Sequence, residues 1–179
     1  SLRLSTGVST SVFLKQTNCR SIQVTTPYFE AIQRIERLHR YFLDVVKAEI
    51  DRKGIRDVNN VQCMILYNIG HDEMTVGELT LRGYYLGSNV SYNVKKMSEN
   101  GYIEQERSVH DKRSIRVKLS DKGKDLYQML SDMFERHEKK IEGTELTPER
   151  ITECIKAMDM FERFWTSQTQ FTGLASLDD

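Results

Sequence analysis

Side chains suited to binding phosphates and base edges are concentrated in one stretch of the 179-residue chain, between residues 80 and 119. This stretch carries eight basic and four acidic side chains, a net charge of +4, although the whole chain is neutral. Salt screens charges within about 8 Å, so the local distribution matters more for phosphate attraction than the total. The candidate contact residues are Arg82, Ser88, Asn89, Ser91, Tyr92, Lys95, Lys96, Arg107, Asp111, Lys112 and Arg113.

Two short helices joined by a turn are predicted to position the first of these side chains. The helix Thr75–Arg82 starts with a capping box, because the side chains of its threonine and of Glu78 can satisfy free backbone N–H groups. A turn containing two glycines follows, and Ser88 can then cap a second helix that runs to Glu99. Asn100-Gly101 is a typical left-handed end for that helix.

A β-hairpin is predicted directly after the second helix. Tyr102–Arg107 and Ser114–Leu119 are short β-prone runs, and the second alternates apolar and basic residues. This order of helix, turn, helix and hairpin is the pattern of a winged helix-turn-helix, whose second helix enters a DNA major groove. The hairpin, or wing, reaches the backbone or the adjacent minor groove. We therefore predict a mostly α fold with a small β-hairpin wing, and double-stranded DNA as the leading partner.

Four longer helices are predicted around this motif. The only two prolines, Pro27 and Pro148, each follow a threonine that can cap a helix, and so mark helix starts. A further helix is expected over Val58–Ile69, with Val61, Met64 and Ile65 buried, and another begins at the cap Ser120. The helices at the two chain ends have apolar stripes at spacings of three and four residues.

These terminal stripes predict a symmetric homodimer. A small winged domain cannot cover helices from both chain ends, so they must bury their apolar faces against each other or against a second copy. A two-fold protein implies a pseudo-palindromic DNA site. The expected division is a flexible N-terminal arm (1–25), a helical dimerisation region (26–56 and 121–168), a winged helix DNA-binding domain (57–120) and a C-terminal tail (169–179).

The wing carries the most specific motif of the chain. Asp111-Lys112-Arg113, followed by Leu119–Gly123, resembles the D-x-R and L-[ST]-x-x-G signature of the MarR family of bacterial transcription regulators. Asn100–Ile103 also fits that family's turn from recognition helix to first wing strand, and the resemblance covers residues 27–168. It implies a DNA-binding regulator, most simply a ligand-responsive repressor that acts as a homodimer.

The resemblance also implies roles for individual residues. Arg113 would enter the minor groove and Asp111 would hold it in position, which agrees with the preference of guanidinium groups for narrow A·T-rich grooves. The chain differs from many relatives at Tyr92, where arginine is common. Arg82 and Arg107 are interpreted as DNA-backbone contacts or as salt bridges. Val24–Pro27 and the long N-terminal arm resemble, less specifically, the branch that regulates cell-wall L,D-transpeptidase genes.

Many MarR relatives bind small aromatic or phenolic effectors in a cleft beside the dimer helices. The corresponding residues here would be His39, Phe42, Cys63, Met64, Tyr67 and Met129. Ordinary core packing accounts for the same spacing. Cys63 is interpreted as an inert buried thiol in preference to an oxidation sensor, since no neighbouring base would activate it.

Other functional classes are disfavoured. No nucleophile elbow, phosphate-binding loop, dinucleotide fingerprint or zinc-protease motif occurs, so an enzyme is not expected. Three cysteines without metal-ligand spacing, and the lack of a long apolar run, predict a reduced cytoplasmic protein without metal or cofactor. The alternative left open is a winged helix used only as a protein-interaction module, without sequence-specific DNA binding.

Overall fold

A computed structural model describes residues 26–83, 87–107 and 114–174, with backbone only for residues 87, 88 and 170–174. The chain forms two units, one up to His39 and the other from Arg40 onward. The helix α1 (Pro27–Arg52) runs through this boundary, and its second half, from Arg40, belongs to the larger unit.

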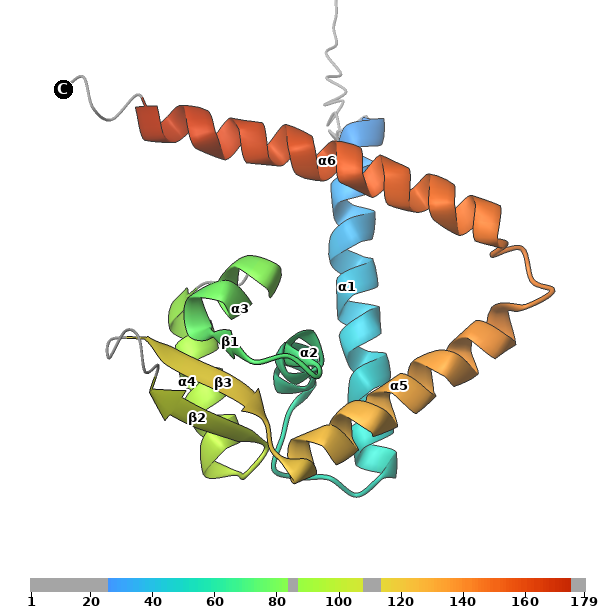
Figure 1. The fold of residues 1–179 in the computed structure, drawn as a ribbon. Helices are drawn as coiled ribbons and strands as arrows, with labels where there is room; N and C mark the ends of the chain where they lie inside the picture. The colour runs from blue at the N-terminus through green and yellow to red at the C-terminus, as the bar shows by residue number, and fades with distance from the viewer. Residues whose placement is uncertain (1–25, 84–86, 108–113, 175–179) are drawn as a thin grey trace, which may run out of the picture. The chain divides into compact units, whose positions relative to one another are not determined.

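The larger unit contains the helix-turn-helix and wing in the predicted order (Figure 1). The structure confirms a mostly helical chain with a small antiparallel sheet. After α1, the elements are α2 (Asn60–Ile69), β1 (Met74–Thr75), α3 (Val76–Gly83), α4 (Gly87–Glu99), β2 (Ile103–Arg107), β3 (Ile115–Leu119), α5 (Asp121–Ile141) and α6 (Pro148–Leu174).

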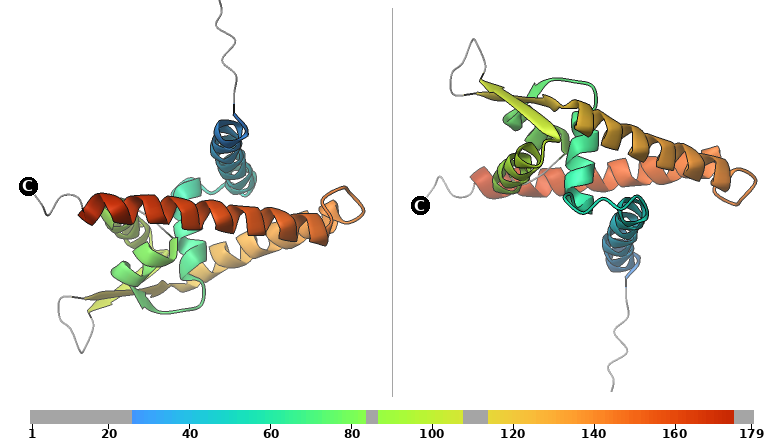
Figure 2. Two further views of the ribbon diagram at one scale, coloured as in Figure 1. Left: turned by 90° about the horizontal axis from the view of Figure 1, so that it is seen from above. Right: turned by 90° about the horizontal axis from the view of Figure 1, so that it is seen from below.

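The sheet has three strands, in the order β1-β3-β2. The hairpin β2–β3 was predicted, whereas the two-residue strand β1 was not. β1 pairs with the inner end of β3, with Met74 opposite Val117. Both views of Figure 2 show β2 and β3 side by side and α5 continuing from the end of β3.

Local capping explains most helix boundaries. Thr75 N–H donates to Glu78 Oε2 at 2.6 Å and Glu78 N–H donates to Thr75 Oγ1 at 3.1 Å, which confirms the predicted capping box. Asn59 and Gln62 form a second capping box at the start of α2. Ser88 was predicted to be the cap of α4, which is wrong, because the helix already begins at Gly87.

The turn from α4 into β2 requires a glycine. Gly101 has φ +79°, and the N–H of Tyr102 donates to the carbonyl of Met97 at 2.9 Å, as in a Schellman cap. Since side-chain-bearing residues rarely adopt positive φ, this turn fixes the path by which α4 leads into the wing.

A second close approach joins the wing to α5. Ser120 caps α5 by accepting a hydrogen bond from the N–H of Gly123 at 3.0 Å, as predicted. A Cβ on Gly123 would lie only 2.1 Å from the carbonyl oxygen of Tyr102. The L-[ST]-x-x-G motif thus has a physical basis: the serine ends the loop and the glycine lets α5 approach the start of β2.

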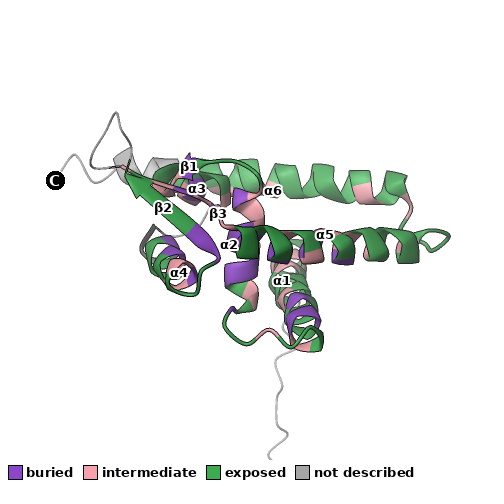
Figure 3. Cartoon of the chain, turned by 60° about the horizontal axis from the view of Figure 1, so that its bottom comes forward, coloured by how far each residue is buried: buried purple, intermediate pink, exposed green. Residues whose placement is uncertain are grey.

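The core of the larger unit is built from the end of α1, α2, α3, α4, the sheet and the first half of α5, where buried positions cluster in Figure 3. Cys63, Leu66, Ile69, Val90, Val117 and Leu130 are fully inaccessible to solvent. Val61 was predicted to be buried but is 39% exposed, because α2 turns Gln62 inward instead. Gln62 Nε2 donates to Asn93 Oδ1 at 3.2 Å, which connects α2 to α4.

An ion cluster ties the second half of α1 to α5. The Glu49 carboxylate accepts hydrogen bonds from Arg52 Nη2 at 2.7 Å and from Arg136 Nη2 at 2.6 Å. The hydrogen bond from Arg52 and then that from Arg136 lower the pKa of Glu49, against the opposing effect of burial. Glu49 is therefore a charged residue held inside the helix pair by two partners.

The helix α6 contrasts with this core. Its described side chains are exposed or half-buried throughout, as the green and pink ribbon of Figure 3 shows. Large apolar residues are among them, namely Ile155, Met158, Met160 and Phe164. None of the described helices combines the length and apolar character that a bilayer crossing requires.

Candidate nucleic-acid interface

The outward face of α4 presents a polar surface. Asn89, Ser91 and Lys95 are exposed, and Tyr92 is 62% exposed. Val90, Val94 and Met97 hold the opposite face of the helix in the core. Amide, hydroxyl and ammonium groups on one exposed helix face are suited to reading base edges and binding phosphates.

Several basic residues near this surface are already paired. Arg82 Nη1 donates to Asp72 Oδ2 at 2.9 Å, so of its two predicted roles the structure shows the salt bridge. Lys96 Nζ lies 3.0 Å from Glu99 Oε2, and this hydrogen bond raises the pKa of Lys96 and lowers that of Glu99. Among the described residues, Lys95 and Arg107 form no ion pair, so they are the described bases of this region most available to an anion.

The two faces of the wing differ in charge. In the hairpin register Glu104 lies opposite Lys118 and Glu106 opposite Arg116, so these four share the outer face. Lys118 Nζ lies 2.9 Å from Glu106 Oε1, which raises the pKa of Lys118, and Arg116 pairs with Glu73 at 2.6 Å. The bases on the outer face of the described hairpin are therefore already paired, Lys118 within the hairpin and Arg116 with Glu73.

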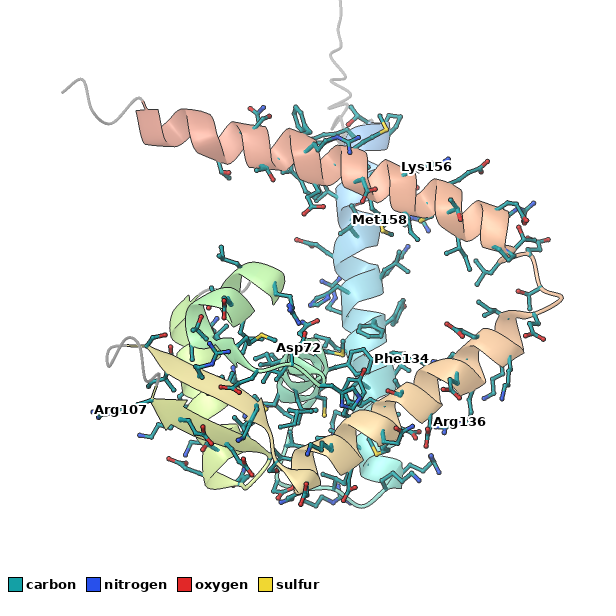
Figure 4. The ribbon with its side chains drawn as sticks, viewed as in Figure 1. Asp72, Arg107, Phe134, Arg136, Lys156 and Met158 are labelled. Atoms are coloured by element: carbon teal, nitrogen blue, oxygen red, sulfur yellow. The ribbon has the colours of Figure 1, made fainter. Side chains whose placement is uncertain are left out.

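The inner face of the wing carries no carboxylate among its described residues. Ile103 and Leu119 are opposite each other and buried, followed by Gln105 opposite Val117 and Arg107 opposite Ile115. Gln105 and Arg107 are exposed on the edge strand β2, although Val117, opposite Gln105 on the central strand, is fully buried. Figure 4 shows Arg107 at the outer end of β2.

A groove of about 580 Å³ lies between α4 and this inner face. Its floor and walls come from the start of α3, one side of α4, and both wing strands. The lining residues are Thr75, Val76, Gly77, Ser91, Val94, Lys95, Gln105, Ser114 and Ile115. Among the lining residues that the structure describes, the groove thus has one cation, several neutral polar groups and no acid.

A polar junction sets the wing against α5 and the loop before α2. Asp57 accepts a hydrogen bond from the Tyr102 hydroxyl and another from Lys122 Nζ, each at 2.6 Å. Hydrogen bonds from Lys122 and then Tyr102 lower the pKa of Asp57. Lys122 Nζ also lies 4.2 Å from the centre of the Tyr102 ring. Three segments that are distant in sequence are therefore linked where the wing begins.

The predicted effector residues are only partly brought together. Phe42 stacks on Phe134 with ring centres 6.2 Å apart, and Tyr67 meets Phe134 edge-on at 5.1 Å. Met64 and Met129 are half-buried against the core, and His39 is exposed in the first unit. Cys63 is fully buried, and burial raises the pKa of its thiol to about 12, which agrees with an inert thiol.

Some predicted contacts lie outside the described residues. Asp111, Lys112 and Arg113 belong to the undescribed part of the wing loop, and nothing is described of the Ser88 side chain. Among the described residues, no group of three His, Cys, Asp or Glu is placed to hold a metal ion.

Comparison with known sequences identifies the family of the chain. The profile of the MarR family matches residues 56–114, which span α2, the helix-turn-helix and the first wing strand. The exopolysaccharide II synthesis transcriptional activator ExpG of Rhizobium meliloti (strain 1021) is 33% identical over 144 residues, covering 80% of this chain and 74% of ExpG. The chain belongs to the MarR family. It is accordingly a DNA-binding transcription regulator with a winged-helix fold.

Solved MarR-type structures share the fold at low sequence identity. Streptococcus pneumoniae FabT in complex with DNA superposes with a TM-score of 0.64 at 18% identity, over 78% of this chain and 98% of FabT. Staphylococcus aureus MarR in complex with salicylate and kanamycin superposes with a TM-score of 0.62 at 21% identity, over 77% of this chain and 91% of that protein.

Sequence reasoning missed three residues of these surfaces. Gln105 was not singled out because a polar residue in an alternating strand is ordinarily solvent-facing. Phe134 and Tyr127 lie on α5, and Tyr127 stacks on Tyr67 at 4.8 Å. Their positions on a long amphipathic helix gave a signal for burial, but none for which aromatic residues they would meet.

Proposed function

We propose that this MarR-family regulator binds a pseudo-palindromic promoter site as a homodimer, with α4 in the major groove and the wing at the minor groove. The observation that carries the proposal is the polar, base-bearing face of α4 beside a wing whose inner face has no described acid. Arg113 and Lys112 at the wing tip, with Asp111 orienting the arginine, would supply the minor-groove contact.

The homodimer is supported by apolar surface that the described chain leaves open. Tyr41, Phe42 and Val45 on α1 are 61%, 37% and 41% exposed. Ile155 and Met158 on α6 are 52% and 47% exposed. Contiguous apolar faces of this kind mark interaction sites in soluble proteins. We assign residues 26–56 and 121–168 to dimerisation and residues 57–120 to DNA binding.

Ligand response is proposed at the aromatic cluster of Phe42, Phe134, Tyr67 and Tyr127, where α1, α2 and α5 meet. The salicylate complex of Staphylococcus aureus MarR suggests a small aromatic or phenolic effector. Such a ligand would weaken DNA binding only if it binds more tightly to a dimer whose two DNA-binding domains do not match the spacing of the half-sites.

The proposed direction of regulation is repression, because a protein seated on a promoter excludes polymerase without needing a further contact. Activation is the second candidate, since ExpG is named an activator. A reporter fused to the promoter of the protein's own gene distinguishes the two. Deletion of the regulator should raise expression if it represses and lower expression if it activates.

A fluorescence anisotropy titration tests the DNA-binding function directly. The probe is a duplex taken upstream of the protein's own gene, measured between 50 and 200 mM salt, over which a protein with six to ten phosphate contacts loses about 10³- to 10⁵-fold in affinity. Sedimentation at the same concentrations should give a dimer. A monomer that ignores the duplex even in dilute buffer would contradict the proposal and favour the protein-interaction module.

A further inference from the structure

The groove between α4 and the wing has the chemical character of a binding site for a polyanion. Its described lining combines the Lys95 ammonium, the Ser91 hydroxyl and the Gln105 amide, and includes no carboxylate. In a chain with as many acids as bases, a groove whose described lining has a cation and no acid is a selective environment for a negatively charged ligand.

The hairpin register explains why the acids are absent. Glu104 and Glu106 flank Gln105 in sequence, yet strand alternation places both on the outer face, where they pair with Lys118. Gln105 alone of the three is directed towards α4. Because β2 is an edge strand of the sheet, the Gln105 side chain is exposed even though Val117, opposite it, is buried.

The neighbouring surfaces identify the anion. When a helix lies in the major groove and the adjacent wing lies at the minor groove, one sugar–phosphate strand of the duplex must pass between them. The groove occupies that position, between the exposed side of α4 and the inner face of β2 and β3.

We propose that Gln105, with Ser91 and Lys95, clasps the phosphate strand that separates the major from the minor groove. This inference rests on the proposed mode of DNA binding and adds a positioning residue to it. Lys95 supplies the charge, while the Gln105 N–H₂ and the Ser91 hydroxyl donate to phosphate oxygens. Since every sequence has the same backbone, the clasp sets affinity for DNA in general and fixes the register of α4, without reading bases.

Gln105→Glu tests the clasp by placing a carboxylate against the phosphates. Like charges in such close contact repel even near a solvated surface, so binding should weaken about tenfold or more. The loss should be equal for the duplex upstream of the protein's own gene and for a shuffled duplex of the same length. Gln105→Ala should weaken both by about three- to tenfold, the range of a typical hydrogen bond, since the donor is lost but no charge is added.

Lys118→Gln is the matched control. It changes the net charge by the same amount on the same hairpin, but on the outer face. Its affinity should stay within about threefold of the wild type, because long-range charge effects are screened. Circular dichroism melts verify that each variant is folded.

The outcomes separate this inference from the function on which it rests. Wild-type protein that binds neither duplex overturns both. Wild-type binding with Gln105→Glu no weaker than Lys118→Gln overturns the clasp alone. A loss confined to the promoter duplex also overturns it, because Gln105 would then read bases. In support, Lys95→Ala should reduce the slope of log affinity against log salt by about one.

Discussion

Met133 on α5 and Met158 on α6 show two opposite environments within one chain. Met133 is 1% exposed inside the closed core of the winged lobe, whereas Met158 is 47% exposed on the face of α6. Both helices carry apolar residues at helical spacing, although α5 is the more strongly amphipathic of the two. The difference teaches that an apolar stripe predicts burial only when the same chain supplies the opposing surface.

The largest expected effect comes from the same substitution at these two methionines. Met133→Ala should lower the free energy of unfolding by about 2–5 kcal/mol, since it leaves a cavity in a packed core. Met158→Ala should leave the intrinsic stability of the lobe nearly unchanged. Urea denaturation followed by circular dichroism measures both.

The protein concentration sharpens this comparison. If a second copy covers α6, Met158→Ala should weaken the dimer, and the urea midpoint should then depend more steeply on protein concentration. Met133→Ala should lower the urea midpoint at every protein concentration. Equal losses for both variants at the lowest concentration would mean that α6 packs within its own chain.

The junction between wing and α5 gives the next largest effect. Gly123→Ala should destabilise the protein by about 1–3 kcal/mol, because the new Cβ would overlap the Tyr102 carbonyl and force the backbone apart. Gly77→Ala is the control, since the nearest atom to its Cβ is 3.8 Å away. Within helix α3 it should be neutral or stabilising by up to about 1 kcal/mol. Thermal melts that rank the two variants in the reverse order would refute this account of the glycine.

The ion cluster of Glu49 with Arg52 and Arg136 should make the stability of the core depend on pH. Its folded pKa is lowered from the ordinary 4.5, so its stabilisation is present above the unfolded pKa and is lost as pH falls through the folded pKa. Glu49→Gln should cost about 1–2 kcal/mol at pH 7, a modest value because Arg52 and Arg136 remain 56% and 45% exposed. The difference from wild type should shrink below about pH 4. A difference that persists unchanged at pH 3 would exclude an ionic role.

The smallest expected effect is an absence of reaction at Cys63. In a Cys19→Ser, Cys154→Ser background, the native protein at pH 8 should not react with a thiol reagent, because the thiol is buried and its pKa is raised to about 12. Full reaction should follow unfolding in urea. Stoichiometric labelling of the native protein would show that the core opens at Cys63 and would revive its role as a sensor.

Locally encoded features were predictable from sequence. The capping box at Thr75, the cap at Ser120 and the hairpin strands depend on residues within a few positions of one another, and the structure confirms each. The MarR family was predicted from the motif around the wing, and the comparisons confirm it.

Features that depend on distant residues were not predictable. Gln62 displaces Val61 from the core because its amide meets Asn93, 31 residues away. β1 forms only because β3, about 40 residues later, offers an open edge. Gln105 became a candidate contact only when the register placed it on the inner face of the edge strand β2, beside the groove. Periodicity alone carries none of this information.

The connection between β3 and α5 consists of Ser120 alone. With the glycine contact on one side and the Asp57 junction on the other, strand and helix have little freedom to bend where they meet. The 21 residues of α5 make a rod about 30 Å long. A tilt of about 5° around the far end of that rod would carry the wing sideways by roughly 3 Å, close to the rise of one base pair. A ligand or partner that binds the distal end of α5 and changes its tilt would therefore shift the position of the hairpin along the duplex.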